Sequence, residues 1–146
     1  MWEIEKLSMI ACLCFLAVCT YWDIRRRTLP VVLLREGTLL SVLYVVCSGR
    51  EYWYLHLAGA GVGLFFLLVS KITKEAIGYG DGWMICILGT FLGISDLLEV
   101  LAAAWLLLSM TAMICLVKKK WSRKTAFPLV PFLMTGYVFV VASRYL

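Results

Sequence analysis

Charged side chains are scarce in this sequence, and their scarcity excludes most soluble folds. Only 16% of the 146 residues are charged, whereas 63% are hydrophobic. The mean hydropathy of +0.92 is far above the range of water-exposed globular domains. A chain of this length has room for several membrane spans and little else. We therefore predict an all-α, polytopic integral membrane protein in which residues 1–146 form a single membrane-embedded domain.

Metal-ligand patterns are missing as well. The chain has one histidine, His56, and no two of its six cysteines have the C-x-x-C spacing that lets two thiolates share a metal. The cysteines all lie within or at the ends of apolar segments, where a thiol usually acts as a small buried hydrophobe. We expect no metal, no cofactor and no disulfide, and a structural or interfacial role for His56.

Long apolar runs are what the sequence has instead. Six of them have about the length of a membrane span: Leu7–Trp22, Leu29–Ser48, Trp53–Ser70, Ala76–Ile94, Leu97–Val117 and Pro128–Ser143. Glu3 and Glu5 precede the first run and no small-residue cleavage site follows it, so we expect it to be retained. The pattern predicts a bundle of about six transmembrane helices.

The net charge of +5 does not indicate a nucleic-acid partner, because the basic residues gather in short clusters between apolar runs. These clusters follow the first, third and fifth runs: Arg25, Arg26 and Arg27; Lys71 and Lys74; Lys118, Lys119, Lys120, Arg123 and Lys124. Basic loops of this kind remain on the cytoplasmic side of a membrane. We predict a multi-pass protein of the cytoplasmic membrane with both termini outside.

Small residues predict close helix packing. Gly59 and Gly63 in the third run, and Gly89 and Gly93 in the fourth, have the small-xxx-small spacing that lets two helices approach closely. Ser95 is expected to be the N-cap of the fifth helix.

Two aspartates require another explanation. Asp23 ends the first run, and Asp81 lies in Gly78-Tyr79-Gly80-Asp81-Gly82, so the topology places both at the cytoplasmic edge of the bundle. Each alone could be an interfacial carboxylate, Asp23 paired with an arginine and Asp81 stabilised by a helix N-terminus. Together at one membrane edge they favour a functional pair. The glycines would permit close approach of another backbone to Asp81.

A pair of carboxylates can hydrolyse a peptide when one is ionised and the other protonated. The ionised group takes a proton from the attacking water, and the protonated group hydrogen-bonds the carbonyl oxygen. Two adjacent carboxyl groups hold a single proton readily, since they titrate as a unit. The sequence leaves open which aspartate is acid and which is base. It also leaves open an alternative, a small transporter or ion-relay component that uses the same two residues.

Three segments resemble the type IV prepilin peptidase family of intramembrane aspartic peptidases. They are Asp23-Ile-Arg-Arg-Arg-Thr-Leu-Pro30, the GxGD motif Gly78-Tyr-Gly-Asp81, and Ala126-Phe-Pro-Leu-Val-Pro-Phe-Leu-Met-Thr-Gly136, which contains Pro128 and Pro131. GxGD alone is a weak signal. The three segments in this order, within six apolar runs, are a more specific one.

The resemblance implies a membrane endopeptidase with Asp23 and Asp81 as its catalytic pair. Its partner would be a prepilin-like or pseudopilin-like precursor, which loses a short basic leader at the cytoplasmic (inner) membrane of a prokaryote. Membrane lipids are the second expected partner, because anionic headgroups attract both the basic leader and the basic loops.

Some features depart from the family. Larger members carry a domain with paired C-x-x-C motifs and methylate the new amino terminus. This chain has no C-x-x-C motif, so it resembles the short, peptidase-only form. Val31 replaces an asparagine common after the proline, and Trp83 stands where many relatives have lysine. An inactive relative that serves as an assembly partner is a third reading, which Trp83 leaves open.

Overall fold

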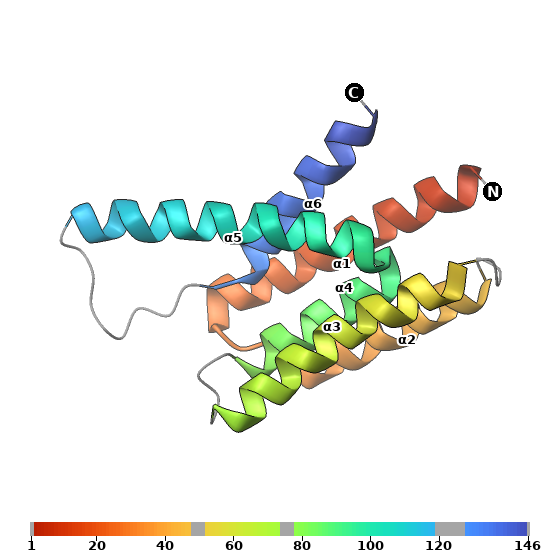
Figure 1. Ribbon diagram of the computed structural model, residues 1–146, viewed down its shortest axis with the longest axis horizontal. Helices are drawn as coiled ribbons and strands as arrows, with labels where there is room; N and C mark the ends of the chain where they lie inside the picture. Colours follow the sequence, from red (N-terminus) through yellow and green to blue (C-terminus); the bar gives the residue numbers. More distant parts are fainter. Residues whose placement is uncertain (1, 48–51, 74–77, 119–127, 146) are drawn as a thin grey trace.

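Six helices make up the fold of this protein in a computed structural model that describes residues 2–47, 52–73, 78–118 and 128–145 (Figure 1). They are α1 (Trp2–Arg26), α2 (Val31–Cys47), α3 (Trp53–Ile72), α4 (Tyr79–Leu92), α5 (Ile94–Val117) and α6 (Val130–Tyr145). The described ranges contain no strand, so the all-α prediction and its six helices are confirmed. Several residues used above lie outside the described ranges: Ser48, Lys74, Ala76, Lys119, Lys120, Arg123, Lys124 and Ala126.

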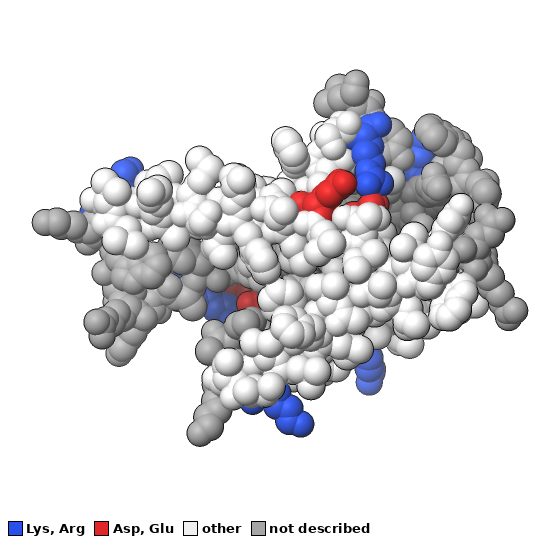
Figure 2. Space-filling view, in the orientation of Figure 1, with Lys and Arg blue, Asp and Glu red and all other residues white. Residues whose placement is uncertain are grey.

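Three of the helices are long and apolar enough to cross a bilayer. They are Lys6–Arg26 within α1, α3 and α5, and Val130–Arg144 is a shorter apolar helix. The outward side chains are apolar too, as Leu39, Leu43 and Val46 on α2 illustrate. Figure 2 shows one face of the molecule on which charged residues occupy only a few places. A surface of this kind is covered by lipid, which makes this a membrane protein.

The α3–α4 pair is the closest helix contact. A Cβ on Gly59 would collide with the backbone of Gly89, and a Cβ on Gly63 would collide with Cys86. A Cβ on Gly82 would lie 3.2 Å from the backbone nitrogen of Leu67. The predicted role of Gly59, Gly63 and Gly89 is confirmed. Continuing this antiparallel register places Asp81 beside Leu68, roughly one turn before α3 ends at Ile72.

Gly93 has a different role from the one predicted. It adopts φ +81 between α4 and α5, a conformation that favours glycine, and it joins the two helices directly. Helix α5 therefore begins at Ile94 with Gly93 as its N-cap, so the prediction of Ser95 as N-cap is wrong. Asp96 lies in the first turn of α5, where it forms a bidentate ion pair with Arg144 of α6.

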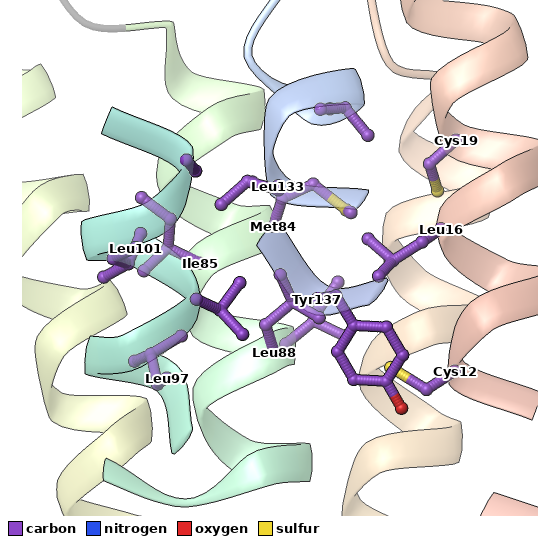
Figure 3. Packing of buried hydrophobic residues seen from close by; sticks show 14 of the residues in the cluster. Cys12, Leu16, Cys19, Met84, Ile85, Leu88, Leu97, Leu101, Leu133 and Tyr137 are labelled. Atoms are coloured by element: carbon purple, nitrogen blue, oxygen red, sulfur yellow. The ribbon is translucent and has the colours of Figure 1, made fainter. Parts of the chain in front are cut away.

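The core lies where α1, α4, α5 and α6 meet (Figure 3). Leu133 and Tyr137 of α6 lie among Leu16 of α1, Met84 of α4 and other apolar side chains, all nearly inaccessible to solvent. The Tyr137 hydroxyl donates a hydrogen bond to the carbonyl of Met9 at 3.3 Å, which satisfies its polar end. Through this core, α6, the last helix of the chain, packs against α1, the first.

Candidate active site

Three of the helix ends that build the site meet at one end of the bundle. Helix α1 ends there, and α4 and α6 begin there, after connections that follow α3 and α5 (Figure 1). Helix α1 stops at Arg26, because Arg27 adopts φ 52 and its N–H bonds the carbonyl of Asp23 at 2.8 Å. Pro30 then precedes α2, and its carbonyl accepts the N–H of Leu34.

Asp23 is a buried carboxylate in the last turn of α1, with only 6% of its surface exposed. Its Oδ2 accepts a hydrogen bond of 3.2 Å from the backbone N–H of Val130, the first residue of α6. Buried carboxylates need such donors, since burial without a partner is costly. The contact joins residues 107 positions apart in the chain.

The arginines after Asp23 do not neutralise it. Arg25 donates a hydrogen bond to the hydroxyl of Tyr21 at 2.7 Å, and the guanidinium of Arg26 lies 4.8 Å from the centre of the Trp22 ring. Both contacts are made one turn back along α1, away from the carboxylate. No ion pair to Asp23 occurs within the described ranges. Pairing with an arginine therefore does not account for Asp23.

Asp81 lies in the first turn of α4, behind the N-cap Gly78. Its N–H bonds the carbonyl of Gly78 at 3.0 Å, which starts the helix. A Cβ on Gly78 would lie 3.1 Å from Asp81 Oδ2, so the absent side chain leaves the space in which the carboxylate sits. Asp81 is partly buried, with intermediate exposure of its surface.

The structure brings the two aspartates to the same end of the bundle, one in the last turn of α1 and the other in the first turn of α4 (Figure 1). Gly80 faces Leu29, because a Cβ on Gly80 would lie 3.5 Å from the Leu29 side chain. The three segments singled out in the sequence thus meet at one place: the end of α1 with its connection to α2, the GxGD turn, and the start of α6. One buried and one partly buried carboxyl group there could exchange protons with a bound water.

Other residues considered in the sequence lie away from this place or serve packing. His56 Nδ1 lies 3.0 Å from the carbonyl of Thr90, so the histidine links α3 to α4, as its predicted structural role requires. Trp83 stacks edge-on against Tyr79 and donates a hydrogen bond of 3.0 Å from Nε1 to Thr38 Oγ1 on α2. Val31 is exposed at the start of α2.

Val130 is the residue that sequence reasoning missed. It contributes its peptide N–H rather than its side chain, so residue type carries no signal. The only available hint was its place between Pro128 and Pro131, which have no N–H of their own. Within the described ranges, no group of three or more His, Cys, Asp or Glu side chains is arranged to hold a metal ion.

Comparison with known proteins assigns the family. The model of the type IV leader peptidase family matches residues 10–117, a range that includes both aspartates and ends with α5. Comparisons with curated proteins and with solved structures find no match. The matched range covers well over half of the chain. Because the family model covers most of an all-helical membrane protein, this protein belongs to the type IV leader peptidase family.

Proposed function

We propose that this protein is an aspartic endopeptidase that removes the short basic leader from prepilin-like precursors. Family membership supports the leader peptidase activity. The observation that carries the aspartic mechanism is that Asp23 and Asp81 lie at the same end of the bundle, where Gly80 faces Leu29. No arginine of the described ranges is paired with Asp23. Burial of a carboxylate without a cationic partner destabilises the folded protein, and carboxylates in such positions of membrane proteins commonly have a function.

The two carboxyl groups act on one water molecule. The ionised carboxylate takes a proton from the water as its oxygen attacks the scissile carbonyl carbon, and the protonated carboxyl gives its proton to the carbonyl oxygen. The resulting diol collapses when the leaving nitrogen receives a proton and the C–N bond breaks. Water reaches the pair at Asp81, which is partly exposed, whereas Asp23 is buried.

The whole chain acts as one peptidase domain, residues 1–146. Asp23 comes from α1, Asp81 from α4 and the N–H that holds Asp23 from α6. The glycine contacts between α3 and α4 fix the position of α4, which carries Asp81. Any part of the chain that contains all of these elements must reach from α1 to α6.

The site lies near the cytoplasmic face of the inner membrane of a prokaryote, with both chain termini outside. Arg25 and Arg26 end α1, Lys71 lies in the last turn of α3, and Lys118 follows α5. These cations lie at the ends of α1, α3 and α5, and Asp23 and Asp81 lie at the same end of the bundle. A basic leader would approach this end along an anionic lipid surface, which attracts both partners.

Substitution of each aspartate tests the proposal. A precursor with a basic leader before an apolar helix is co-expressed with the wild type, Asp23→Asn or Asp81→Asn, and leader removal is followed by the change in precursor mass. We expect each variant to lose at least about a hundredfold in rate, because each removes a proton-transfer group.

Asp96→Asn is the matched control. It removes an acidic residue from α5 that pairs with Arg144 at the opposite end of the bundle, so we expect cleavage to persist. Leader removal that survives both Asp23→Asn and Asp81→Asn would show that the aspartates are not the catalytic pair. The ion-relay alternative instead predicts no leader removal by the wild type, together with Asp-dependent ion flux.

A further inference from the structure

The N-terminus of α6 is arranged to offer one hydrogen-bond donor to Asp23. The N–H groups of Phe132 and Leu133 bond the carbonyl of Leu129 at 3.0 and 3.1 Å, and they close the first turn. Pro131 has no N–H. The Val130 N–H remains, and it points at Asp23 Oδ2. The proline pattern therefore leaves a single backbone donor beside a buried carboxylate.

From this contact we infer that the peptide N–H of Val130 positions Asp23 as the ionised member of the pair, the general base, with Asp81 as the proton-bearing acid. This inference rests on the proposed function and assigns roles within it. A backbone N–H stabilises a carboxylate more than a carboxylic acid, and the positive end of the α6 dipole acts in the same direction. At the C-terminal end of its own helix α1, Asp23 has no such support.

The surroundings of Asp81 favour the opposite state. Its carboxyl group accepts no hydrogen bond from the residues that the structure describes, although it lies in the first turn of α4. The dipole of that turn acts on Asp81 as well, but a dipole without a direct donor acts more weakly than a charge-assisted hydrogen bond. With Asp23 at the same end of the bundle and held as a carboxylate by the Val130 N–H, the shared proton resides on Asp81.

With these roles, the proton transfers balance over one catalytic cycle. Asp23 takes a proton from water while the water oxygen bonds the scissile carbon, and Asp81 protonates the carbonyl oxygen. Asp23 next delivers its proton to the leaving nitrogen, the C–N bond breaks, and Asp81 recovers a proton from the diol. One water is consumed, one acid and one amine are released, and both side chains return to their initial states.

The groups that could disturb this assignment are few. On α1 they are Cys19, one turn before Asp23, and the arginines at 25–27, of which Arg25 and Arg26 contact aromatic rings. On α4 the group is Asp81. The first seven residues of α6, positions 130–136, carry no titratable side chain. The Val130 N–H is therefore the feature of α6 to test.

Val130→Pro removes this N–H and little else. Proline is favoured at the first position of a helix, and its ring has the same number of side-chain carbons as valine. Val130→Ala is the control, because it trims the buried side chain and keeps the N–H. Both variants are purified in the same membrane mimetic, checked for helix content, and assayed for leader cleavage across a range of pH.

We expect Val130→Pro to lower kcat by roughly tenfold to a hundredfold and to move the acid limb of its pH profile to higher pH, because Asp23 is protonated more readily without the donor. Val130→Ala should keep the acid limb at its wild-type pH, whatever its rate. If both variants show the same profile, Val130 is only a packing residue and the inference fails. If Val130→Pro does not fold, an ester in place of the Val130 amide removes the same N–H and must give the same shift.

The outcomes separate this inference from the proposed function. Cleavage that survives Asp23→Asn and Asp81→Asn contradicts the proposed function itself. Loss of cleavage in those variants, together with an unshifted profile in Val130→Pro, leaves the peptidase in place and overturns only the assignment of Asp23 as base.

Discussion

Gly78 and Gly80 flank the same tyrosine, yet they have different neighbours. A Cβ at position 78 would lie 3.1 Å from Asp81 Oδ2, which is closer than ordinary van der Waals contact. A Cβ at position 80 would lie 3.5 Å from Leu29, an ordinary distance. Within the GxGD motif, the first glycine therefore makes space for the carboxylate, whereas the second brings the α1–α2 connection close.

The two glycines should differ in their effect on cleavage. Gly78→Ala should displace the Asp81 carboxyl by a few tenths of an ångström and lower kcat by about tenfold or more, because proton transfer depends on such distances. Gly80→Ala should cause a smaller loss. Steady-state cleavage rates of the two variants at equal folded concentration measure the difference. Equal losses would show that Gly78 has no special relation to Asp81.

The residues of the site illustrate what the sequence can and cannot predict. Asp23 and Asp81 were predicted, because carboxylates in apolar surroundings are conspicuous. An ion pair of Asp23 with an arginine was one of the readings that the sequence allowed, but Arg25 and Arg26 contact Tyr21 and Trp22, each four positions earlier on α1. Those spacings were visible in the sequence. The Val130 N–H was not, because every residue except proline carries one.

Helix α4 depends on glycine for its place in the bundle. Gly89 meets the backbone of Gly59 so closely that a Cβ on either would collide with the other helix. Gly61, two positions along α3, has open space where its Cβ would be. The small-xxx-small pattern predicted the Gly59–Gly89 contact. It also included Gly93, which ends α4 instead, because spacing alone does not distinguish a packing glycine from one at a helix end.

This contrast gives a stability test on one helix. Gly59→Ala should destabilise the protein by about 1–3 kcal/mol, because the helices must separate. Gly61→Ala should be neutral or stabilise by up to about 1 kcal/mol, because alanine favours helix. Thermal unfolding in detergent compares the two variants with the wild type. A Gly59→Ala protein as stable as Gly61→Ala would show that the α3–α4 contact is looser than described.

At the scale of the whole molecule, the distribution of charged residues agrees with the arrangement of the helices. The basic residues at the ends of α1, α3 and α5 lie at the end of the bundle with Asp23 and Asp81, whereas the Asp96–Arg144 pair lies at the other end. The positive-inside rule was enough to predict this arrangement from the sequence. The short α4 was not predicted: its 14 residues span only about 21 Å, less than the hydrocarbon core of a bilayer.

Reporter fusions test the orientation. Alkaline phosphatase, which is active only outside the cytoplasm, should be active when fused after Leu146 and inactive when fused after Lys118. A fluorescent protein that folds only in the cytoplasm should give the opposite pattern. The reversed result for both fusions would place Asp23 and Asp81 on the outer face, where a cytoplasmic leader could not reach them.

The hydrogen bond between Asp23 and Val130 also means that the site is completed late in the synthesis of the chain. Because the two residues are 107 positions apart, the ribosome completes α1, α4 and α5 before the donor for Asp23 exists. A nascent chain therefore carries both aspartates for much of its synthesis without a finished pair. Precursors emerging beside it in the same membrane would be cleaved only by enzymes whose sixth helix has already inserted.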